Sequence, residues 1–188
     1  GMMAAATAGS RNLEVMLIEK NEKLGKKLYL TGKGRCNVTN NSDPENLIAN
    51  VPTNGRFLYS AFSAFNSRDL VALLKDLGLA TKVERGDRIF PVSDKSSDVI
   101  RALKKHLNRY HVQQKLHTEA DRILADNGHV TGVLLKSGKI LPCSSVILAT
   151  GGLSYPTTGS TGDGYRFAKE LGHTVTPLTP SLVPLETM

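Results

Sequence analysis

The order of the elements predicted along the chain is that of an α/β fold, in which helices pack against strands. Residues 14–19 form a short apolar run that ends in an acid, which is typical of a buried parallel strand. Residues 145–149 form a second continuous apolar run, and a glycine-rich loop follows it directly. Helical and strand-like patterns occupy the chain between these two runs and complete the α/β arrangement.

The helices are predicted from apolar spacing and from end signals. Residues 2–8 are good helix formers, and the helix is expected to stop at Gly9. Residues 67–77 carry leucines at i, i+3, i+4 and i+7, with Ser67 as the expected N-cap and Gly78 as the residue after the end. Further helices are predicted over 56–65, 97–109 and 162–171.

The strands are predicted from alternating apolar residues and from turn signals. Residues 79–84 and 88–92 are expected to pair as a hairpin across residues 85–87. Residues 21–54 favour neither helix nor strand, apart from a possible helical turn near 24–28. Three strands are predicted at 112–116, 120–125 and 130–135, with a tight turn at Asn127–Gly128 between the last two, and a second turn at 137–138 leads to residues 139–141.

Composition and net charge limit the classes of protein to which this chain can belong. The 188 residues and the apolar fraction of 40% suit one ordinary domain with a core. No apolar run approaches the roughly 18 residues that a membrane span needs, and the N-terminus does not suit a signal peptide, so a cytoplasmic protein is expected. The net charge of +7 could suit nucleic acid, but the bases are scattered and aromatic residues make up only 5%. A nucleic-acid partner is therefore not favoured.

The cysteines and histidines do not indicate a metal site. Cys36 and Cys143 lie far apart, and neither belongs to a CxxC pair, so two reduced thiols are expected. The five histidines show no metal-ligand spacing.

Glu19 closes the strand predicted at 14–19. A carboxylate at that position can accept both hydroxyls of a ribose in a dinucleotide-binding fold; the alternative is a solvent-facing acid paired with Lys20. The strand and the GxGxxG turn that precede such an acid are not in the sequence. Gly1 stands 18 residues before Glu19, which suits the last glycine of that fingerprint, and it could equally be a remnant of a tag.

Residues 31–40, TGKGRCNVTN, are the most informative stretch. Their two glycines permit left-handed backbone and a close approach to a planar ligand. The spacing is not that of a Walker A loop, and a polar surface loop remains the alternative. The side chains that could contact a ligand are Thr31, Lys33, Arg35, Asn37, Thr39 and Asn40.

Residues 149–164 form the second candidate loop. Five glycines after the apolar run leave backbone N–H groups free of Cβ hindrance, and Thr150, Thr158, Ser160 and Thr161 supply hydroxyls. Asp163 is expected in the first turn of the following helix, where capping is the alternative to ligand contact.

These stretches, in this order, resemble the hallmark motifs of the HI0933-like FAD/NAD(P)-binding flavoproteins. The similarity covers nearly the whole chain. It is carried by LIEKN (17–21), GKK (25–27), TGKGRCNVTN (31–40), RIFPVS (88–93), VILATGG (146–152), SYP (154–156), GSTGDG (159–164) and PSLVPL (180–185).

The resemblance implies a Rossmann-like three-layer domain with a β-meander that holds FAD noncovalently. It implies an oxidoreductase that passes electrons between a nicotinamide cofactor, NAD(P)H, and a small-molecule substrate, with no catalytic acid or base assigned. Cys36 is then expected to be a packed thiol near the cofactor rather than a redox partner. The cofactor-binding candidates are Gly1, Glu19, Lys20, Lys27, Thr31, Gly32, Lys33, Gly34, Arg35, Cys36, Asn37, Thr39, Asn40, Ala149, Thr150, Gly151, Gly152, Gly162 and Asp163.

The resemblance also implies a division of the chain. Residues 1–180 are expected to form a partial FAD-binding domain that contains a helical and hairpin segment at about 56–96. That domain would lack its first strand and its C-terminal return, and residues 181–188 would connect to an inserted domain. Such a fragment is expected to bind FAD weakly or not at all. Two alternatives are a flavin-linked protein that associates with or modifies RNA, such as tRNA, and a catalytically silent truncated product.

Overall fold

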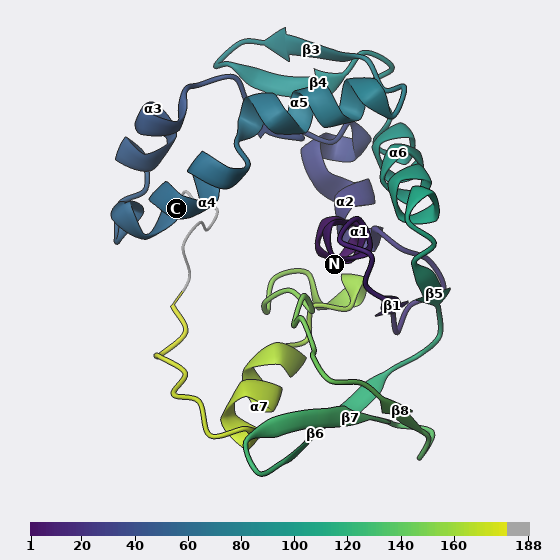
Figure 1. Ribbon diagram of the computed structural model, residues 1–188. Coiled ribbons are helices and arrows are strands. Elements are labelled where there is room, and N and C mark those ends of the chain that lie inside the picture. The colour runs from purple at the N-terminus through teal and green to yellow at the C-terminus, as the bar shows by residue number, and fades with distance from the viewer. Residues whose placement is uncertain (180–188) are drawn as a thin grey trace, which may run out of the picture. The chain divides into compact units, whose positions relative to one another are not determined.

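The computed structural model describes residues 1–179, and the chain divides into two compact units. Unit 1 is Gly1–Glu119, and unit 2 begins at Ala120 (Figure 1). The predicted connection at 181–188 lies outside the described residues. Among the described residues, no helix is long and apolar enough to cross a membrane.

Unit 1 holds most of the helices and two small sheets. Its elements are α1 Met2–Gly9, β1 Met16–Ile18, α2 Lys26–Leu30, the 3-10 turn η1 Thr31–Gly34, β2 Thr39–Asn40, α3 Pro44–Ala49, η2 Gly55–Leu58, α4 Tyr59–Ala64, α5 Ser67–Asp76, β3 Thr81–Glu84, β4 Arg88–Pro91, α6 Ser96–Arg109 and β5 Gln113–Lys115. Strands β1 and β5 pair in parallel, with Leu17 opposite Gln114. Strands β2, β4 and β3 form an antiparallel sheet in that order.

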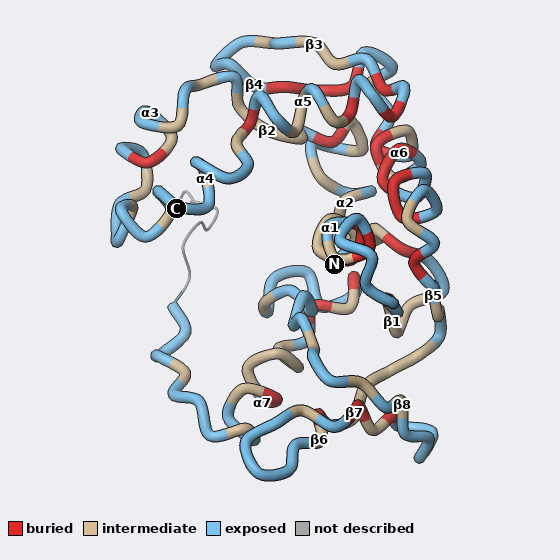
Figure 2. The backbone as a smooth tube through the Cα atoms, viewed as in Figure 1, coloured by how far each residue is buried: buried red, intermediate tan, exposed pale blue. Residues whose placement is uncertain are grey.

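Helix α6 organises the core of unit 1. Val99, Leu103 and Leu107 recur on one face and are buried, whereas the opposite face is polar (Figure 2). Helix α1 packs against α6 through the small residues Ala6 and Gly9, which let the two backbones approach closely. The parallel pair β1–β5 follows from these contacts, because α1 leads into β1 and α6 leads into β5.

The β3–β4 hairpin and helix α5 form the second part of the core. The predicted turn at 85–87 is present, with Gly86 and Asp87 in the left-handed region. A cluster of buried side chains joins α5, α6 and the chain near the hairpin: Cys36, Leu74, Leu77, Leu79, Val99, Ala102 and Leu103.

Unit 2 consists of the predicted meander and one helix. Its elements are β6 Ala120–Asp126, β7 His129–Leu135, β8 Ile140–Pro142, the 3-10 turn η3 Pro156–Thr158 and α7 Asp163–Glu170. Strand β7 pairs antiparallel with both neighbours. Asn127 and Gly128 both have positive φ at the β6–β7 turn, as a tight hairpin turn requires. Helix α7 is tied to the meander by Arg166, which donates to the Asp121 carbonyl at 2.8 Å.

Two local predictions in unit 1 were wrong. Asn66, not Ser67, caps α5: its side chain accepts the amides of residues 68 and 69, and Asp69 accepts the Asn66 N–H in return. Residues 44–49 form the helix α3, within a segment that the apolar pattern had left irregular. The signal for α3 lies in its start, because Asp43 caps the helix and Pro44 occupies the first helical turn.

The buried strand predicted at 145–149 is also wrong. The segment has no strand assignment, and Ile147 and Leu148 are 66% and 41% exposed. An apolar run can become a buried strand only where another strand offers its edge. Within the described residues no strand pairs with this segment.

Candidate cofactor-binding site

Glu19 follows directly on β1, and its backbone extends the parallel pairing. The Glu19 N–H donates to the Lys115 carbonyl at 2.9 Å, and the Glu19 carbonyl accepts the Thr118 N–H at 2.9 Å. The side chain is oriented by Asn21, whose backbone N–H and side-chain amide both donate to Oε1, at 2.9 and 2.8 Å. A carboxylate has about four acceptor positions, so Glu19 can accept further hydroxyl groups in this orientation. The sequence pattern did not single out Asn21.

The N-terminal end of α1 lies within electrostatic range of this carboxylate. Burial lowers the pKa of the Gly1 amino group, and the charge of Glu19 acts in the opposite direction, so the two groups are electrostatic neighbours. No side chain caps α1, and its first turn holds no acid. The amides at this helix end can therefore act on an external anion. The predicted pair of Gly1 and Glu19 is thus brought together within unit 1.

The lysines between β1 and η1 contribute positive charge along the same segment. Lys20 and Lys27 are half-buried, and both interact with other groups of the protein. Lys26 is bonded to Glu22 at 3.2 Å and to the Asn21 side chain at 3.3 Å. These three lysines therefore interact with other groups of the protein, and their charges are not simply exposed to solvent.

The chain from Thr31 to Cys36 makes a left-handed turn. Gly32, Lys33, Gly34 and Cys36 all have positive φ, at 57°, 56°, 86° and 61°. Left-handed backbone costs a residue with a Cβ about 1–2 kcal/mol, so Lys33 and Cys36 need compensating contacts. Two backbone bonds close the turn, from residue 35 to residue 32 at 3.2 Å and from residue 36 to residue 31 at 3.0 Å.

Arg35 is fixed to the hairpin by an ionic network. Its guanidinium donates to Glu84 at 2.5 Å and to Asp94 at 2.9 and 2.6 Å, and it lies over the Phe90 ring at 4.3 Å. Lys82 bonds to the same two acids, at 3.3 Å to Glu84 and 2.7 Å to Asp94. The hydrogen bond to Glu84 raises the pKa of the Arg35 guanidinium most, and the hydrogen bond to Asp94 raises it further. Two cations and two anions therefore neutralise one another, and no spacing rule predicts this pairing from the sequence.

Cys36 is a core residue. Its side chain is fully buried among apolar residues of α5 and α6, and burial raises the pKa of its thiol, against a smaller effect of the Thr31 hydrogen bond. A low-pKa redox thiol has the opposite environment. The prediction of a packed thiol is confirmed, and contact of Cys36 with a cofactor stays a prediction.

The polar side chains that follow Cys36 bond mainly to the sheet. The Asn37 amide donates to the carbonyls of Thr39 and Ile89, both at 2.9 Å, and the Asn40 amide donates to the Gly86 carbonyl at 3.0 Å. These bonds fasten β2 to the hairpin. Of the side chains predicted in the loop, Lys33 is the charged one that is left exposed at the tip of the turn.

The candidate loop of unit 2 is built around the start of α7. Ala149, Thr150 and Gly151 are exposed, and Gly152 is half-buried. A Cβ at Gly164 would lie 2.6 Å from the Thr150 hydroxyl oxygen, so the loop lies close to the helix there. Gly162 is the N-cap of α7, with a φ of 85°.

Asp163 lies in the first turn of α7, as predicted. Its Oδ2 accepts the Thr161 hydroxyl at 2.9 Å. That bond and its position at the helix N-terminus fit a capping role. Contact of these unit 2 residues with a cofactor stays a prediction.

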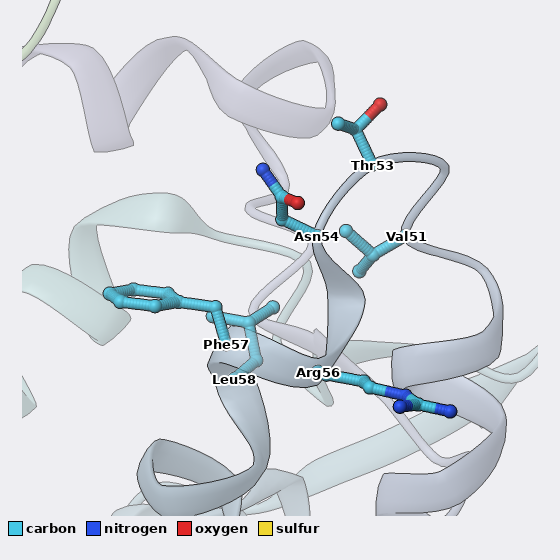
Figure 3. A pocket seen from close by; sticks show the side chains of 6 residues that line it. All are labelled: Val51, Thr53, Asn54, Arg56, Phe57 and Leu58. Carbon is cyan, nitrogen blue, oxygen red and sulfur yellow. The ribbon is translucent and has the colours of Figure 1, made fainter.

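Two open hollows mark the surface of unit 1. The larger, of about 600 Å3, lies where η2 follows α3, and Figure 3 shows the residues that line it: Val51, Thr53, Asn54, Arg56, Phe57 and Leu58. Phe57 is 86% exposed. The second, of about 470 Å3, lies beside Gly9 and Tyr110. Neither hollow contains a residue from the predicted cofactor site, and among the described residues no group of His, Cys, Asp and Glu could hold a metal ion.

A carboxylate at the end of a parallel strand, a helix N-terminus near it and a meander are features of a Rossmann-like α/β protein. The chain belongs to the family described as HI0933-like protein Rossmann domain, whose model matches residues 1–188.

Three known proteins are similar to the chain. A 3-dehydro-bile acid delta(4,6)-reductase of Clostridium scindens is 33% identical over 97% of this chain and 43% of the relative. A ribosomal RNA dihydrouridine synthase of Escherichia coli is 31% identical over 98% of this chain and 45% of the relative. The chain therefore spans less than half the length of these relatives. The Sdh1 complex of Mycobacterium smegmatis in its apo form shares the fold, with a TM-score of 0.67, 20% identity, and coverage of 90% of this chain and 36% of that chain.

Proposed function

We propose that the protein is an FAD-dependent oxidoreductase and that unit 1 binds the adenosine end of FAD. The observation that carries the proposal is the Glu19 carboxylate at the end of a parallel strand, within electrostatic range of the N-terminus of α1. A helix N-terminus favours the pyrophosphate, and a carboxylate beside it favours the ribose hydroxyls.

The residues of unit 1 fit this part of the cofactor. The first turn of α1 holds no acid that would repel a pyrophosphate, and three alanines at 4–6 follow Met2 and Met3. Asn21 holds Glu19 through Oε1, which orients the carboxylate without neutralising its charge. FAD, when bound, supplies the group that accepts and donates hydride. The protein binds and orients it, and NAD(P)H is the proposed electron donor.

Reduction of a carbon–carbon double bond is the proposed type of reaction. A delta(4,6)-reductase reduces such a bond, and dihydrouridine is uridine with a reduced ring double bond, so the names of both relatives describe this chemistry. The two names differ in the size of the substrate, which is a steroid acid in one protein and ribosomal RNA in the other.

RNA as the substrate is a second candidate, and the distribution of charge favours it. Unit 1 carries 19 Lys and Arg against 12 Asp and Glu, whereas residues 120–188 carry 5 of each. The whole net charge of +7 therefore falls in unit 1, and a basic unit attracts a phosphate backbone. Binding of ribosomal RNA in a gel shift at low salt, weakened as salt rises, would support this candidate, and no shift at low salt would remove it.

Removal of the Glu19 carboxylate tests the proposed function. Flavin binding is measured by visible absorbance after purification and by titration of the apoprotein with FAD. Glu19→Ala is expected to weaken FAD binding about tenfold to a hundredfold, because hydrogen bonds to a charged group contribute about 1.5–3 kcal/mol.

The matched control is Glu14→Ala, which removes an exposed acid at the other end of the same strand segment. It is expected to leave FAD affinity unchanged. Equal losses of FAD affinity in the two variants would contradict the proposal.

A further inference from the structure

The left-handed turn at residues 31–36 carries two cations in different environments. Arg35 is bonded to Glu84 and Asp94 and stacked on Phe90. Lys33 stands at the exposed tip of the turn, with a φ of 56°. The charge of Arg35 is therefore paired within the protein, whereas the charge of Lys33 is exposed to solvent.

Arg35 and the backbone of the turn contact the same hairpin residue. The guanidinium lies over the Phe90 ring at 4.3 Å, and a Cβ at Gly32 would lie 3.2 Å from Cε1 of that ring. Arg35 and Gly32 thus hold the turn on Phe90 from two positions. The carboxylates that fix Arg35 belong to the hairpin, at Glu84, and to the loop after it, at Asp94.

This network supports a conformation that the turn sequence disfavours. Lys33 and Cys36 are not glycines, yet both adopt the left-handed region. Burial of the Cys36 side chain fixes the end of the turn, and the Arg35 network fixes the residue before it. Without Arg35, the tip from Gly32 to Gly34 would keep its backbone closures and the approach of Gly32 to Phe90, but no ionic contact with the hairpin.

We propose that Arg35 is a positioning residue that holds the turn so that Lys33 meets the bound cofactor. In this proposal Arg35 acts through the turn and not by contact with the cofactor, since its Nε and Nη2 donate to Glu84 and Asp94. The part that concerns Lys33 rests on the proposed FAD function. The part that concerns the turn does not.

The first experiment follows the turn without flavin. Amide hydrogen exchange and trypsin cleavage after Lys33 are measured on the apoprotein. Arg35→Met is expected to speed exchange in residues 31–36 by about tenfold or more, since local opening then needs less free energy. Asp94→Asn, which keeps Arg35, is expected to act in the same direction.

The matched control is Arg109→Met, which removes another ion pair of unit 1, with Asp76 at 2.5 Å. It is expected to leave exchange in 31–36 unchanged. Unchanged exchange in Arg35→Met, or an equal rise in the control, would overturn the inference.

The second experiment follows the flavin. Lys33→Met is expected to weaken FAD binding, because it removes an exposed cation that attracts the anionic cofactor. Arg35→Met is expected to weaken FAD binding too, but to cause no further loss in the Lys33→Met background. A full further loss in the double variant would show that Arg35 acts on FAD directly and would overturn its positioning role.

The two proposals fail separately. Equal losses of FAD affinity in Glu19→Ala and Glu14→Ala, while Arg35→Met still loosens the turn, would refute the proposed function and leave the role of Arg35 in the turn. Normal FAD binding with unchanged exchange in Arg35→Met would refute the inference and leave the proposed function.

Discussion

The contact between α1 and the end of α6 leaves no room for a side chain at Gly9. A Cβ at this position would lie 2.9 Å from Tyr110 Cβ, 3.1 Å from the Tyr110 carbonyl oxygen and 3.3 Å from a Val112 methyl. The carbonyl belongs to the backbone, so it cannot turn aside as a flexible side chain could. Gly9→Ala therefore requires α1 to move away from α6.

Two opposing effects set the magnitude. Alanine favours the helix over glycine by about 0.8–1.0 kcal/mol in a helix interior, and less at Gly9, which is the last residue of α1. Overpacking of a close contact costs about 1–3 kcal/mol. The steric cost is expected to prevail, and Gly9→Ala should lower the free energy of unfolding by about 1–2 kcal/mol.

Urea unfolding of the purified protein, followed by circular dichroism, measures this change. Thr7→Ala in the same helix is the control, because residue 7 is exposed and alanine should stabilise the helix slightly. A Gly9→Ala protein as stable as the original would refute the reasoning, since it would mean that α1 can shift from α6 at no cost. A loss in Thr7→Ala equal to that in Gly9→Ala would do so too, because it would point to a general sensitivity of α1.

Three further predictions concern titratable groups. Cys143 is half-buried and should react readily with a thiol reagent, whereas Cys36 should react only when the protein unfolds, so one thiol should be labelled in the native state. Burial lowers the pKa of His106 below its ordinary 6.5, so the unfolded state binds the proton more readily. The free energy of unfolding should therefore decline as the pH falls below 6.5, and His106→Leu should flatten that decline in urea titrations at several pH values. Hydrogen bonds to cations hold the pKa values of Glu84 and Asp94 below their ordinary 4.5 and 3.8. Their contribution to stability is present above those values and is lost as the pH falls through the lower folded-state values, so a Glu84→Gln, Asp94→Asn variant should lose less stability in acid than the original protein.

The regular elements could largely be predicted from the sequence where their signals are local. The helix at 96–109 follows from apolar residues repeated on one face, and the hairpins follow from alternation around Gly86 and Gly128. The strand expected at 145–149 failed because hydrophobicity indicates a preference for burial but supplies no partner edge. Membership of the HI0933-like family follows from motifs whose order is itself a property of the sequence.

The amino-acid sequence alone establishes which chemical groups the loop at 31–40 carries, and it predicts Glu19 at the end of a strand. The roles of those groups depend on contacts that form only when the chain folds. Arg35 and Lys33 are two residues apart and carry the same charge, so no local pattern distinguishes them. The partners of Arg35 lie 49 and 59 residues further along the chain, at Glu84 and Asp94. The charge of Arg35 is neutralised because folding of the hairpin brings those carboxylates to it, and Lys33 stays exposed because the turn directs it away from them.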